Sequence, residues 1–234
     1  MSGAAPLGVD LQNACAKRLN CLVKKTWGMT ELSPVGTINS DDKNRPGSAG
    51  ELVPGCEAKI VDLETGQERG PNEKGELWIK GPNVIKGYLN NEEATRNTIT
   101  PDGFLKTGDI ALIDEAGFVF ILDRSKELIK YKGFQVAPAE LEGLIGAMEE
   151  IQDVLVIPVP DEEAGEIPRA YVSFKPGCEL SEQAIKDHVA TNAAPHKKLR
   201  GGVVIVDEVP RSASGKLLRR VIVEEERKVR EGSN

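Results

Sequence analysis

The stretch that most constrains the fold is residues 123–142, which read DRSKELIKYKGFQVAPAELE. Its lysines alternate with apolar residues around a lone glycine, Gly133, and an alternation of period two predicts a β-ribbon with its cations on one edge. Several cations on one edge can converge on a single anionic ligand. Pro138 then begins an amphipathic helix, since proline suits the first helical turn. A basic hairpin without a function remains the alternative on this stretch alone.

The composition limits the partners that the chain can have. Its 234 residues suffice for one large or two small domains, and 39% hydrophobic with 29% charged residues is typical of a globular protein. The net charge of −7 gives no general attraction to nucleic acid, and 4% aromatic residues are too few for base-stacking surfaces. We therefore predict no nucleic-acid partner, and any anion site must be a local basic cluster.

The cysteines and the two ends of the chain indicate an intracellular protein. The 4 cysteines form no CxxC pair and there are only 2 histidines, so a zinc site is not expected and the thiols are interpreted as reduced. No apolar run approaches ~18 residues, so no membrane-spanning helix is predicted. The N-terminus lacks the pattern of a signal peptide, and the C-terminus is not of the Ser-Lys-Leu type. We expect a cytoplasmic location, with the peroxisome as the alternative.

The apolar periodicity changes at residue 123. The part before it begins like the tail of an α/β sheet and continues as short strands between glycine turns, which predicts an antiparallel, barrel-like subdomain. Its expected elements are a helix at 10–19, a short buried strand at 21–23, strands at 58–63, 75–80, 110–114 and 118–123, and a short helix at 90–99. The part after it mixes both periodicities, which predicts an α+β domain. Its expected elements are a hairpin over 127–136, a helix from Pro138, strands at 154–159, 170–174 and 202–209, a helix at 181–192 with Ser181 as N-cap, and a helix at 216–230.

A loop over residues 26–31, with the sequence TWGMTE, follows the first predicted strand. It can present Thr30 as a hydroxyl donor to a phosphate and Glu31 as a hard oxygen ligand for Mg²⁺. Trp27 could stack on a flat base. The alternative is a turn that contains a buried tryptophan.

Two further loops are candidates for binding. Residues 105–109, LKTGD, are expected as a loop that presents Asp109, whose carboxylate could accept two hydrogen bonds from a ribose; an Asx turn is the alternative. Residues 210–216, PRSASGK, are expected as a mobile loop that delivers Lys216 at a helix start. They lack the full spacing of a phosphate loop, so the lysine would act as a point charge toward a developing negative charge. A solvated linker is the alternative here.

Taken in order, these motifs resemble the adenylate-forming acyl-CoA synthetases, and most closely the branch of 4-coumarate–CoA ligase and firefly luciferase. The resemblance covers essentially the whole chain, but only the later part of such an enzyme, because the family's Ser/Thr/Gly-rich ATP-phosphate loop has no counterpart here. The segments that carry it are SGAAPLG (2–8), WGMTE (27–31), GELWIKGPNVIKGYLNNEEAT (75–95), KTGD (106–109), the stretch 123–142, and PRSASGKLLRR (210–220).

The resemblance implies a reaction in two steps. An acid and ATP would give an acyl-adenylate and pyrophosphate, and the CoA thiol would then displace AMP, so ATP/AMP, CoA and Mg²⁺ are the implied cofactors. Lys216 would stabilise negative charge as the carboxylate attacks the α-phosphorus. Lys126 would be the hinge, and Lys130 and Gln135 would contact the adenylate during thioester formation.

The resemblance also implies the binding residues. Trp27 would pack on the adenine, Thr30 would contact the α-phosphate and Glu31 would hold Mg²⁺. Asp109 would bind the ribose hydroxyls, with Arg124 beside it. Further residues expected at the nucleotide or the CoA channel are Lys25, Thr26, Lys132 and Gly133, and those expected around the acid are Ala4, Gly28, Pro34 and Val35.

The chain departs from its relatives beside the tryptophan. Lys25 and Thr26 stand where relatives commonly have glutamine and then glycine or alanine, and a β-branched Thr26 would narrow the acyl pocket. Ser125 stands where leucine is frequent. The narrower pocket bears on whether 4-coumarate is the substrate.

We therefore expect a mixed α/β and α+β chain. Residues 1–123 would be the C-terminal part of the large AMP-binding domain, with its barrel-like subdomain, and residues 124–234 the small mobile lid domain. The expected function is that of a 4-coumarate–CoA ligase-like enzyme of phenylpropanoid metabolism, incomplete in this chain alone and monomeric in full-length form. A fatty-acyl or luciferase-type ligase, or an inactive regulatory fragment, is the alternative.

Overall fold

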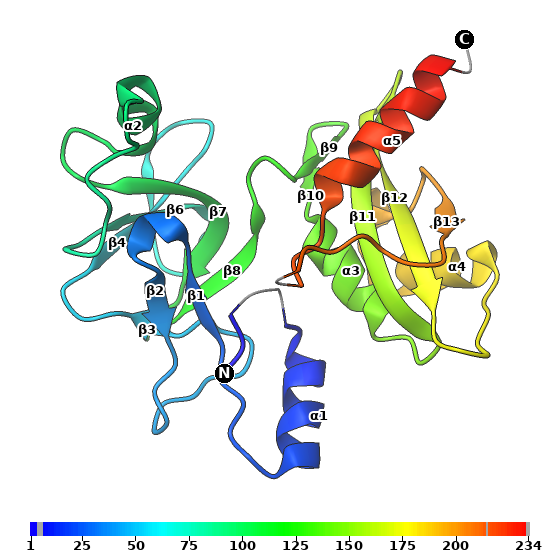
Figure 1. Cartoon of the computed structure of the whole chain (residues 1–234), viewed down its shortest axis with the longest axis horizontal. Coiled ribbons are helices and arrows are strands. Elements are labelled where there is room, and N and C mark those ends of the chain that lie inside the picture. The colour runs from blue at the N-terminus through cyan, green and yellow to red at the C-terminus, as the bar shows by residue number, and fades with distance from the viewer. Residues whose placement is uncertain (4–6, 214, 233–234) are drawn as a thin grey trace. The chain divides into compact units, whose positions relative to one another are not determined.

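The computed structural model describes residues 1–3, 7–213 and 215–232. The chain separates into two units, Met1–Lys126 and Glu127–Asn234, which Figure 1 shows in blue to green and in green to red. The predicted division into the tail of a large domain and a lid remains a prediction about function. Ala4, which is expected around the acid, lies outside the described residues.

Helix α1 (Val9–Leu19) opens the first unit and confirms the helix predicted at 10–19. It carries Asp10 in its first turn and basic residues in its last, as the helix dipole favours. The buried strand predicted at 21–23 is wrong, since Leu22 is 49% exposed. No strand among the described residues pairs with this apolar triplet, so it has no sheet to join.

The first unit is built from two antiparallel sheets. Gly50 and Val119 form an isolated antiparallel bridge between them, but the sheets are not closed into a barrel. The antiparallel prediction is therefore confirmed, while the arrangement is open. One sheet has the order β1-β2-β3, from β1 (Thr26–Gly28), β2 (Val35–Ile38) and β3 (Glu51–Leu52). The other has the order β5-β4-β6-β7-β8, from β4 (Glu57–Val61), β5 (Glu68–Arg69), β6 (Gly75–Lys80), β7 (Leu105–Ile113) and β8 (Val119–Arg124).

The core of the first unit follows the period of two in its strands. In β6, Leu77 and Ile79 are fully buried, whereas Glu76 and Trp78, which alternate with them, point to the other face. Leu32, on the short 3₁₀ helix η1 (Thr30–Leu32), packs into the same cluster. The helix predicted at 90–99 is α2 (Glu92–Thr98).

The second unit has three layers, with a mixed sheet between helices (Figure 1). Strand β11 is buried on both faces: Val154 and Val156 join the cluster of α3 and α4, whereas Leu155 and Ile157 join that of α5. The strands are β9 (Ile129–Tyr131), β10 (Phe134–Val136), β11 (Ile151–Asp161), β12 (Gly165–Phe174) and β13 (Val203–Ile205). The helices are α3 (Pro138–Gly146), α4 (Glu182–Asn192), the 3₁₀ helix η2 (Pro195–Lys197) and α5 (Arg219–Gly232).

The terminal helix begins later than the periodicity predicts. The backbone N–H of Gly215 donates to the carbonyl of Ser212 (2.8 Å), and that of Ser212 donates to the carbonyl of Lys216 (2.9 Å). These bonds form a turn, so the helix predicted from 216 begins at Arg219.

The predicted cap of α4 is confirmed, because the Ser181 hydroxyl accepts the N–H of Ala184 (3.2 Å). Among the described residues, no helix combines the length and the apolar composition needed to cross a bilayer.

Candidate functional site

Strand β1 positions Trp27 through a close approach of two backbones. A Cβ atom added at Gly28 would lie 1.9 Å from the carbonyl oxygen of Pro34, so only glycine allows β1 and β2 to pair here. Val35 is the register partner of Gly28. These residues, expected around the acid, thus determine the path of β1.

The KTGD motif lies within strand β7 and not in the loop predicted at 105–109. The hydroxyl of Thr107 donates to the carbonyl of Leu77 (2.7 Å) and accepts the N–H of Asp109 (3.1 Å). Gly108 has a φ of +72°, which favours glycine, and its N–H donates to the Glu76 carboxylate (2.9 Å). The loop prediction was wrong because these bonds to β6 are non-local and hold the glycine within the sheet.

Asp109 joins three motifs that are far apart in the sequence. Its carboxylate accepts the indole N–H of Trp27 (2.9 Å), which lies 82 residues away, and faces Arg124 Nε at 3.3 Å. Asp109 is 4% exposed, whereas the Arg124 side chain is 63% exposed. The predicted nucleotide residues of β1, β7 and β8 therefore meet around one buried carboxylate, and the guanidinium beside it reaches solvent.

Glu31 is held by a residue that the sequence analysis did not single out. The hydroxyl of Tyr88 donates to the Glu31 carboxylate (2.8 Å), and the backbone N–H of Ile85 donates to the Glu31 carbonyl (2.9 Å). Burial, with this hydrogen bond, raises the pKa of Tyr88. A signal for Tyr88 was present, since a phenol stands within the GYLNNEEAT part of the family motif. Thr30 is exposed beside Glu31.

Lys25 and Thr26 are engaged with other backbone groups. The ammonium of Lys25 donates to the carbonyl of Gly47 (3.0 Å), and burial lowers the pKa of Lys25. The hydroxyl of Thr26 donates to the carbonyl of Thr37 (2.6 Å). Lys25 and Thr26 therefore contact backbone carbonyls, whereas the indole N–H of Trp27, the next residue, donates to the Asp109 carboxylate.

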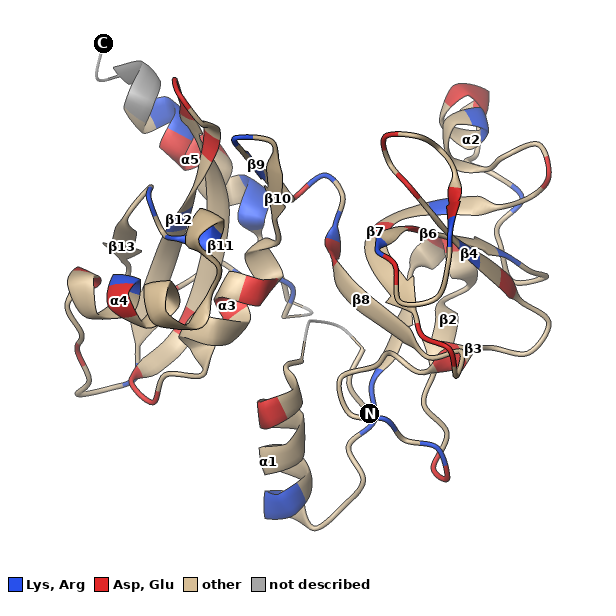
Figure 2. Cartoon of the chain, turned by 180° about the vertical axis from the view of Figure 1, so that it is seen from behind, with Lys and Arg blue, Asp and Glu red and all other residues tan. Residues whose placement is uncertain are grey.

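The basic ribbon is the predicted hairpin of β9 and β10. Lys130 and Gln135 are register partners, and both side chains are exposed. The turn between the strands has φ values of +45° at Lys132 and +82° at Gly133, the conformation of a type I′ turn. Figure 2 shows basic residues on β9 and at this turn. Lys126, the predicted hinge, is also exposed.

The Lys216 turn is attached to strand β11. Arg211 makes a two-pronged ion pair with Asp153, with Nε and Nη2 at 2.6 and 2.7 Å from its oxygens, and Arg211 Nη1 also donates to the carbonyl of Gly215 (2.5 Å). Lys216 itself is exposed. These contacts attach the turn that carries Lys216 to β11. The sequence predicts the same segment, residues 210–216, as a mobile loop.

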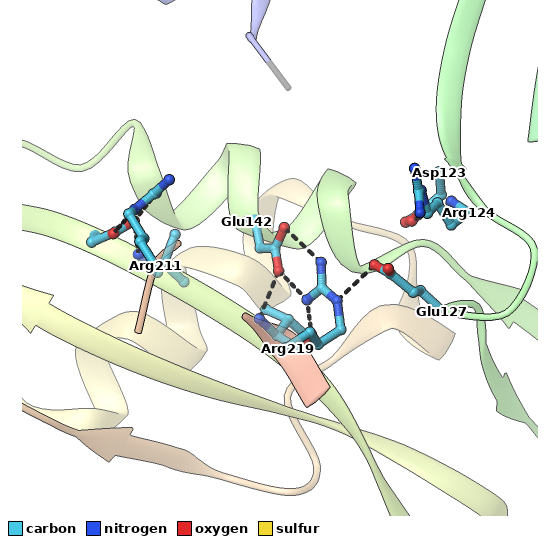
Figure 3. Close-up of polar contacts among 9 residues, drawn as sticks. Asp123, Arg124, Glu127, Glu142, Arg211 and Arg219 are labelled. Atoms are coloured by element: carbon cyan, nitrogen blue, oxygen red, sulfur yellow. Dashed lines mark hydrogen bonds and ion pairs between the residues drawn. The ribbon is translucent and has the colours of Figure 1, made fainter. Parts of the chain in front are cut away.

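Arg219 is a second residue that the sequence analysis missed. Its side chain is 14% exposed and lies between the carboxylates of Glu127 and Glu142 (Figure 3). Burial alone lowers the pKa of Arg219, but the two carboxylates outweigh burial and raise it above its usual value. The adjacent Arg220 is paired with Glu224 and is 90% exposed, so nothing in the sequence distinguishes the buried arginine from the exposed one.

The part of the chain that the structure describes offers few ligands for a metal ion. Within the described residues, no three His, Cys, Asp or Glu side chains come together as a metal site. Glu31 is a single carboxylate, which fits Mg²⁺ bound chiefly through the oxygens of a nucleotide and water. A dedicated protein cage for a metal is not supported by this donor set.

An open antiparallel subdomain with a buried aspartate is followed in this chain by a three-layer unit with exposed lysines, and family models match both parts. The family model of the AMP-binding enzymes matches residues 1–89, and that of the AMP-binding enzyme C-terminal domain matches residues 140–216. The chain belongs to the AMP-binding enzyme family.

Relatives with several names are similar to this chain. It is 48% identical over 226 residues to 4-coumarate–CoA ligase-like 4 of Oryza sativa subsp. japonica, and 46% identical over 226 residues to peroxisomal OPC-8:0-CoA ligase 1 of Arabidopsis thaliana. It is 47% identical over 224 residues to luciferin 4-monooxygenase of Photinus pyralis. These alignments each cover 95% of this chain, and the chain spans 41% of each relative's length.

Solved structures share the fold. ATP-bound MatB from Rhodopseudomonas palustris aligns with a TM-score of 0.91 at 35% identity, covering 97% of this chain and 45% of that one. The o-succinylbenzoate coenzyme A synthetase MenE of Bacillus subtilis, in complex with ATP and magnesium ion, aligns with a TM-score of 0.81 at 33% identity. The alignment covers 93% of this chain and 44% of that one. The predicted mixed α/β fold of an adenylate-forming enzyme is thereby confirmed.

Proposed function

We propose that the chain is the C-terminal part of an acid–CoA ligase that activates a carboxylic acid with ATP and transfers the acyl group to CoA. The observation that carries the proposal is the buried Asp109 carboxylate between Trp27 and Arg124. A carboxylate held in this way is oriented to accept hydrogen bonds from a ribose, beside an indole suited to an adenine. The names of the similar CoA ligases support the same reaction.

The first half-reaction forms an acyl-adenylate. Asp109 holds the ribose hydroxyls and Thr30 contacts the α-phosphate. Glu31 would hold Mg²⁺, which would neutralise phosphate charge. A carboxylate oxygen of the acid attacks the α-phosphorus, and the bond from that phosphorus to the pyrophosphate oxygen breaks. Lys216 stabilises the negative charge that develops, as a preorganised cation does in a water-poor site.

The second half-reaction forms the thioester. The second unit turns about Lys126 and replaces Lys216 by the β9–β10 hairpin, with Lys130 and Gln135 toward the adenylate and Gly133 at the CoA channel. The CoA sulfur, having lost its proton, attacks the acyl carbonyl, and AMP leaves. Such an alternation of domain positions is common in enzymes that perform two steps at one site.

The acid is proposed to be a hydroxycinnamate such as 4-coumarate, which the name of one relative supports. Fatty acids and luciferin-type acids are the alternatives, and the names of two other relatives include OPC-8:0 and luciferin. Because Thr26 is expected to narrow the acyl pocket, it counts against 4-coumarate itself, and this acid needs a direct test against the alternatives. A panel of these acids, assayed by AMP formation, distinguishes the candidates. We further propose a monomer that acts in the cytoplasm, with the peroxisome as the alternative suggested by one relative.

The experiment joins this chain to the upstream part of the rice relative and measures each half-reaction. Pyrophosphate exchange reports adenylation, and AMP release from supplied acyl-adenylate with CoA reports thioester formation. We expect Lys216→Ala to reduce the first by roughly 10²–10³-fold and Lys130→Ala to reduce the second by a similar factor. Lys228→Ala, on the exposed surface of α5, is the control. Equal losses of pyrophosphate exchange in both site variants would contradict the proposed alternation.

The chain alone provides a second test. Because the motif for the ATP phosphates has no counterpart in it, we expect no ATP–pyrophosphate exchange from the purified 234-residue chain. Exchange above that of a denatured sample would show that this unaided chain binds and activates both substrates, contrary to the proposal.

A further inference from the structure

The position of Lys216 depends on the residues at both ends of its turn. On the N-terminal side, Arg211 is paired with Asp153 of β11. On the C-terminal side, the N–H of Leu218 donates to the carbonyl of Pro210 (2.9 Å), and α5 begins at the next residue. Whatever holds the first residue of α5 therefore also holds the base of the lysine turn.

Arg219 is this first residue, and its guanidinium has three partners within the second unit. Nε donates to Glu127 at 2.7 Å, Nη1 donates to Glu142 at 2.5 Å, and Nη1 also donates to the backbone carbonyl of Val156. Figure 3 shows the guanidinium between the two carboxylates. One side chain thus connects the start of α5 with α3, β11 and the first residue of the unit.

The partners of Arg219 are themselves held in place. Glu142 accepts the backbone N–H of Val156 (2.8 Å), so its carboxylate is fixed against β11, and its side chain is 10% exposed. A lysine at position 219 would keep the charge, but a single ammonium cannot reproduce the planar fork that contacts separate partners at once. The geometry therefore requires arginine and not merely a cation.

The hairpin with Lys130 is supported by different contacts. The backbone N–H of Lys130 donates to the Glu166 carboxylate (2.8 Å), and that of Lys132 donates to the carbonyl of Ala164 (2.9 Å). Tyr131 of β9 is the register partner of Gly165 of β12. Because the contacts of Arg219 are not among them, the lysine turn and the hairpin can be perturbed separately.

We propose that Arg219 is a positioning residue for Lys216, acting by clamping the start of α5 to Glu142, Val156 and Glu127. This inference rests on the proposed function, in which Lys216 serves adenylation and Lys130 serves thioester formation. It adds that adenylation depends on a buried guanidinium that contacts neither the nucleotide nor the acid.

The experiment compares Arg219→Lys with Arg220→Lys in the joined polypeptide described above. Both changes keep the charge, but position 220 is exposed and pairs with Glu224 of its own helix. We expect Arg219→Lys to reduce pyrophosphate exchange about tenfold or more and to change thioester formation from supplied adenylate less than twofold. Arg220→Lys should leave both within twofold. Equal losses in both half-reactions, or full adenylation by Arg219→Lys, would overturn the proposal.

Glu127→Ala is the second variant, and it decides the question if Arg219→Lys does not fold. Glu127 has a side chain that is 32% exposed, so its removal takes away one arm of the clamp with little loss of packing. We expect the same selective loss of adenylation, of about threefold. In the double variant the losses should not multiply, since both changes act on one contact. Unchanged adenylation in Glu127→Ala, or multiplied losses, would count against the clamp.

Hydrogen exchange on the chain as it stands separates this inference from the proposed function. In Arg219→Lys and in Glu127→Ala, the amides of Gly215 and Lys216 should exchange faster than in the unaltered chain, and those of β9 should not change. If the unaltered joined polypeptide shows no pyrophosphate exchange, the proposed function fails while this measurement still decides the clamp. Unchanged exchange at Gly215 and Lys216 would overturn the clamp whatever the activity.

Discussion

Replacing Asp109 with asparagine removes a negative charge from a side chain that is 4% exposed and accepts the indole N–H of Trp27 at 2.9 Å. A hydrogen bond to a charged group contributes about 1.5–3 kcal/mol. The ion pair with Arg124, whose side chain is 63% exposed, adds only about 0–1 kcal/mol because solvent screens it. Since asparagine can retain one acceptor for the indole, we expect a loss of about 2 kcal/mol in the free energy of unfolding of the first unit.

The assay is urea unfolding followed by tryptophan emission. Both tryptophans, Trp27 and Trp78, lie in Met1–Lys126, so the emission reports this unit and not the other. With a urea dependence of about 1–3 kcal/mol per molar for a small domain, a loss of this size moves the midpoint by roughly 1 M. The slope of the transition should not change.

Asp102→Asn is the matched control. The Asp102 side chain is 60% exposed and lies 3.8 Å from Lys59, so its removal should cost less than about 0.5 kcal/mol. If Asp109→Asn also lowers the free energy of unfolding by less than about 0.5 kcal/mol, the reasoning that the Trp27–Asp109 bond holds β1 against β7 is refuted. A large change in slope would instead mean that the unfolded or native state had changed its compactness.

Three further outcomes follow from the geometry. Gly133→Ala should lower stability by about 1–2 kcal/mol, measured by thermal unfolding, because φ is +82° although a Cβ there would meet no neighbour within 4 Å; an unchanged melting temperature would contradict the turn conformation. The lowered pKa of Lys25 means that the unfolded chain binds more protons than the folded one, so the free energy of unfolding should rise as pH increases from the folded pKa toward 10.5. The urea midpoint of the unaltered chain should therefore rise with pH relative to that of Lys25→Met. A difference between the two midpoints that does not change with pH would disprove this. Glu31→Gln in the joined polypeptide should raise the Mg²⁺ concentration needed for half-maximal pyrophosphate exchange several-fold, whereas a merely structural role would lower the rate at all Mg²⁺ concentrations.

Local patterns were sufficient for most of the secondary structure. The cap at Ser181, the proline at the start of α3 and the glycine turn of the ribbon are determined within a few residues, and the structure confirms each of them. The prediction at 21–23 failed because an apolar triplet forms a strand only when a neighbour pairs with it. The start of α5 was misplaced because turn hydrogen bonds compete for the backbone groups of residues 212–218.

The candidate site was predictable only in part. The motifs indicated Trp27, Asp109 and Arg124 as separate elements, and the strand register of β7 and β8 makes two of them partners. Tyr88 and Arg219 were missed because the groups that they contact lie far away in the chain. Tyrosine is found both at surfaces and in cores, and arginine is mostly exposed, so residue type alone did not indicate the contacts of these two side chains.

By itself, the sequence determined the alternation of strands and helices, the family to which the chain belongs and the lysines that it presents. These properties are encoded in residue order, periodicity and turn chemistry over short distances. Only the tertiary structure decided that Asp109 meets Trp27 across 82 residues and that Arg219 meets Glu142 across 77. Burial and partner choice are properties of packed elements, because a carboxylate or guanidinium acquires its energetic weight only when other segments remove it from water.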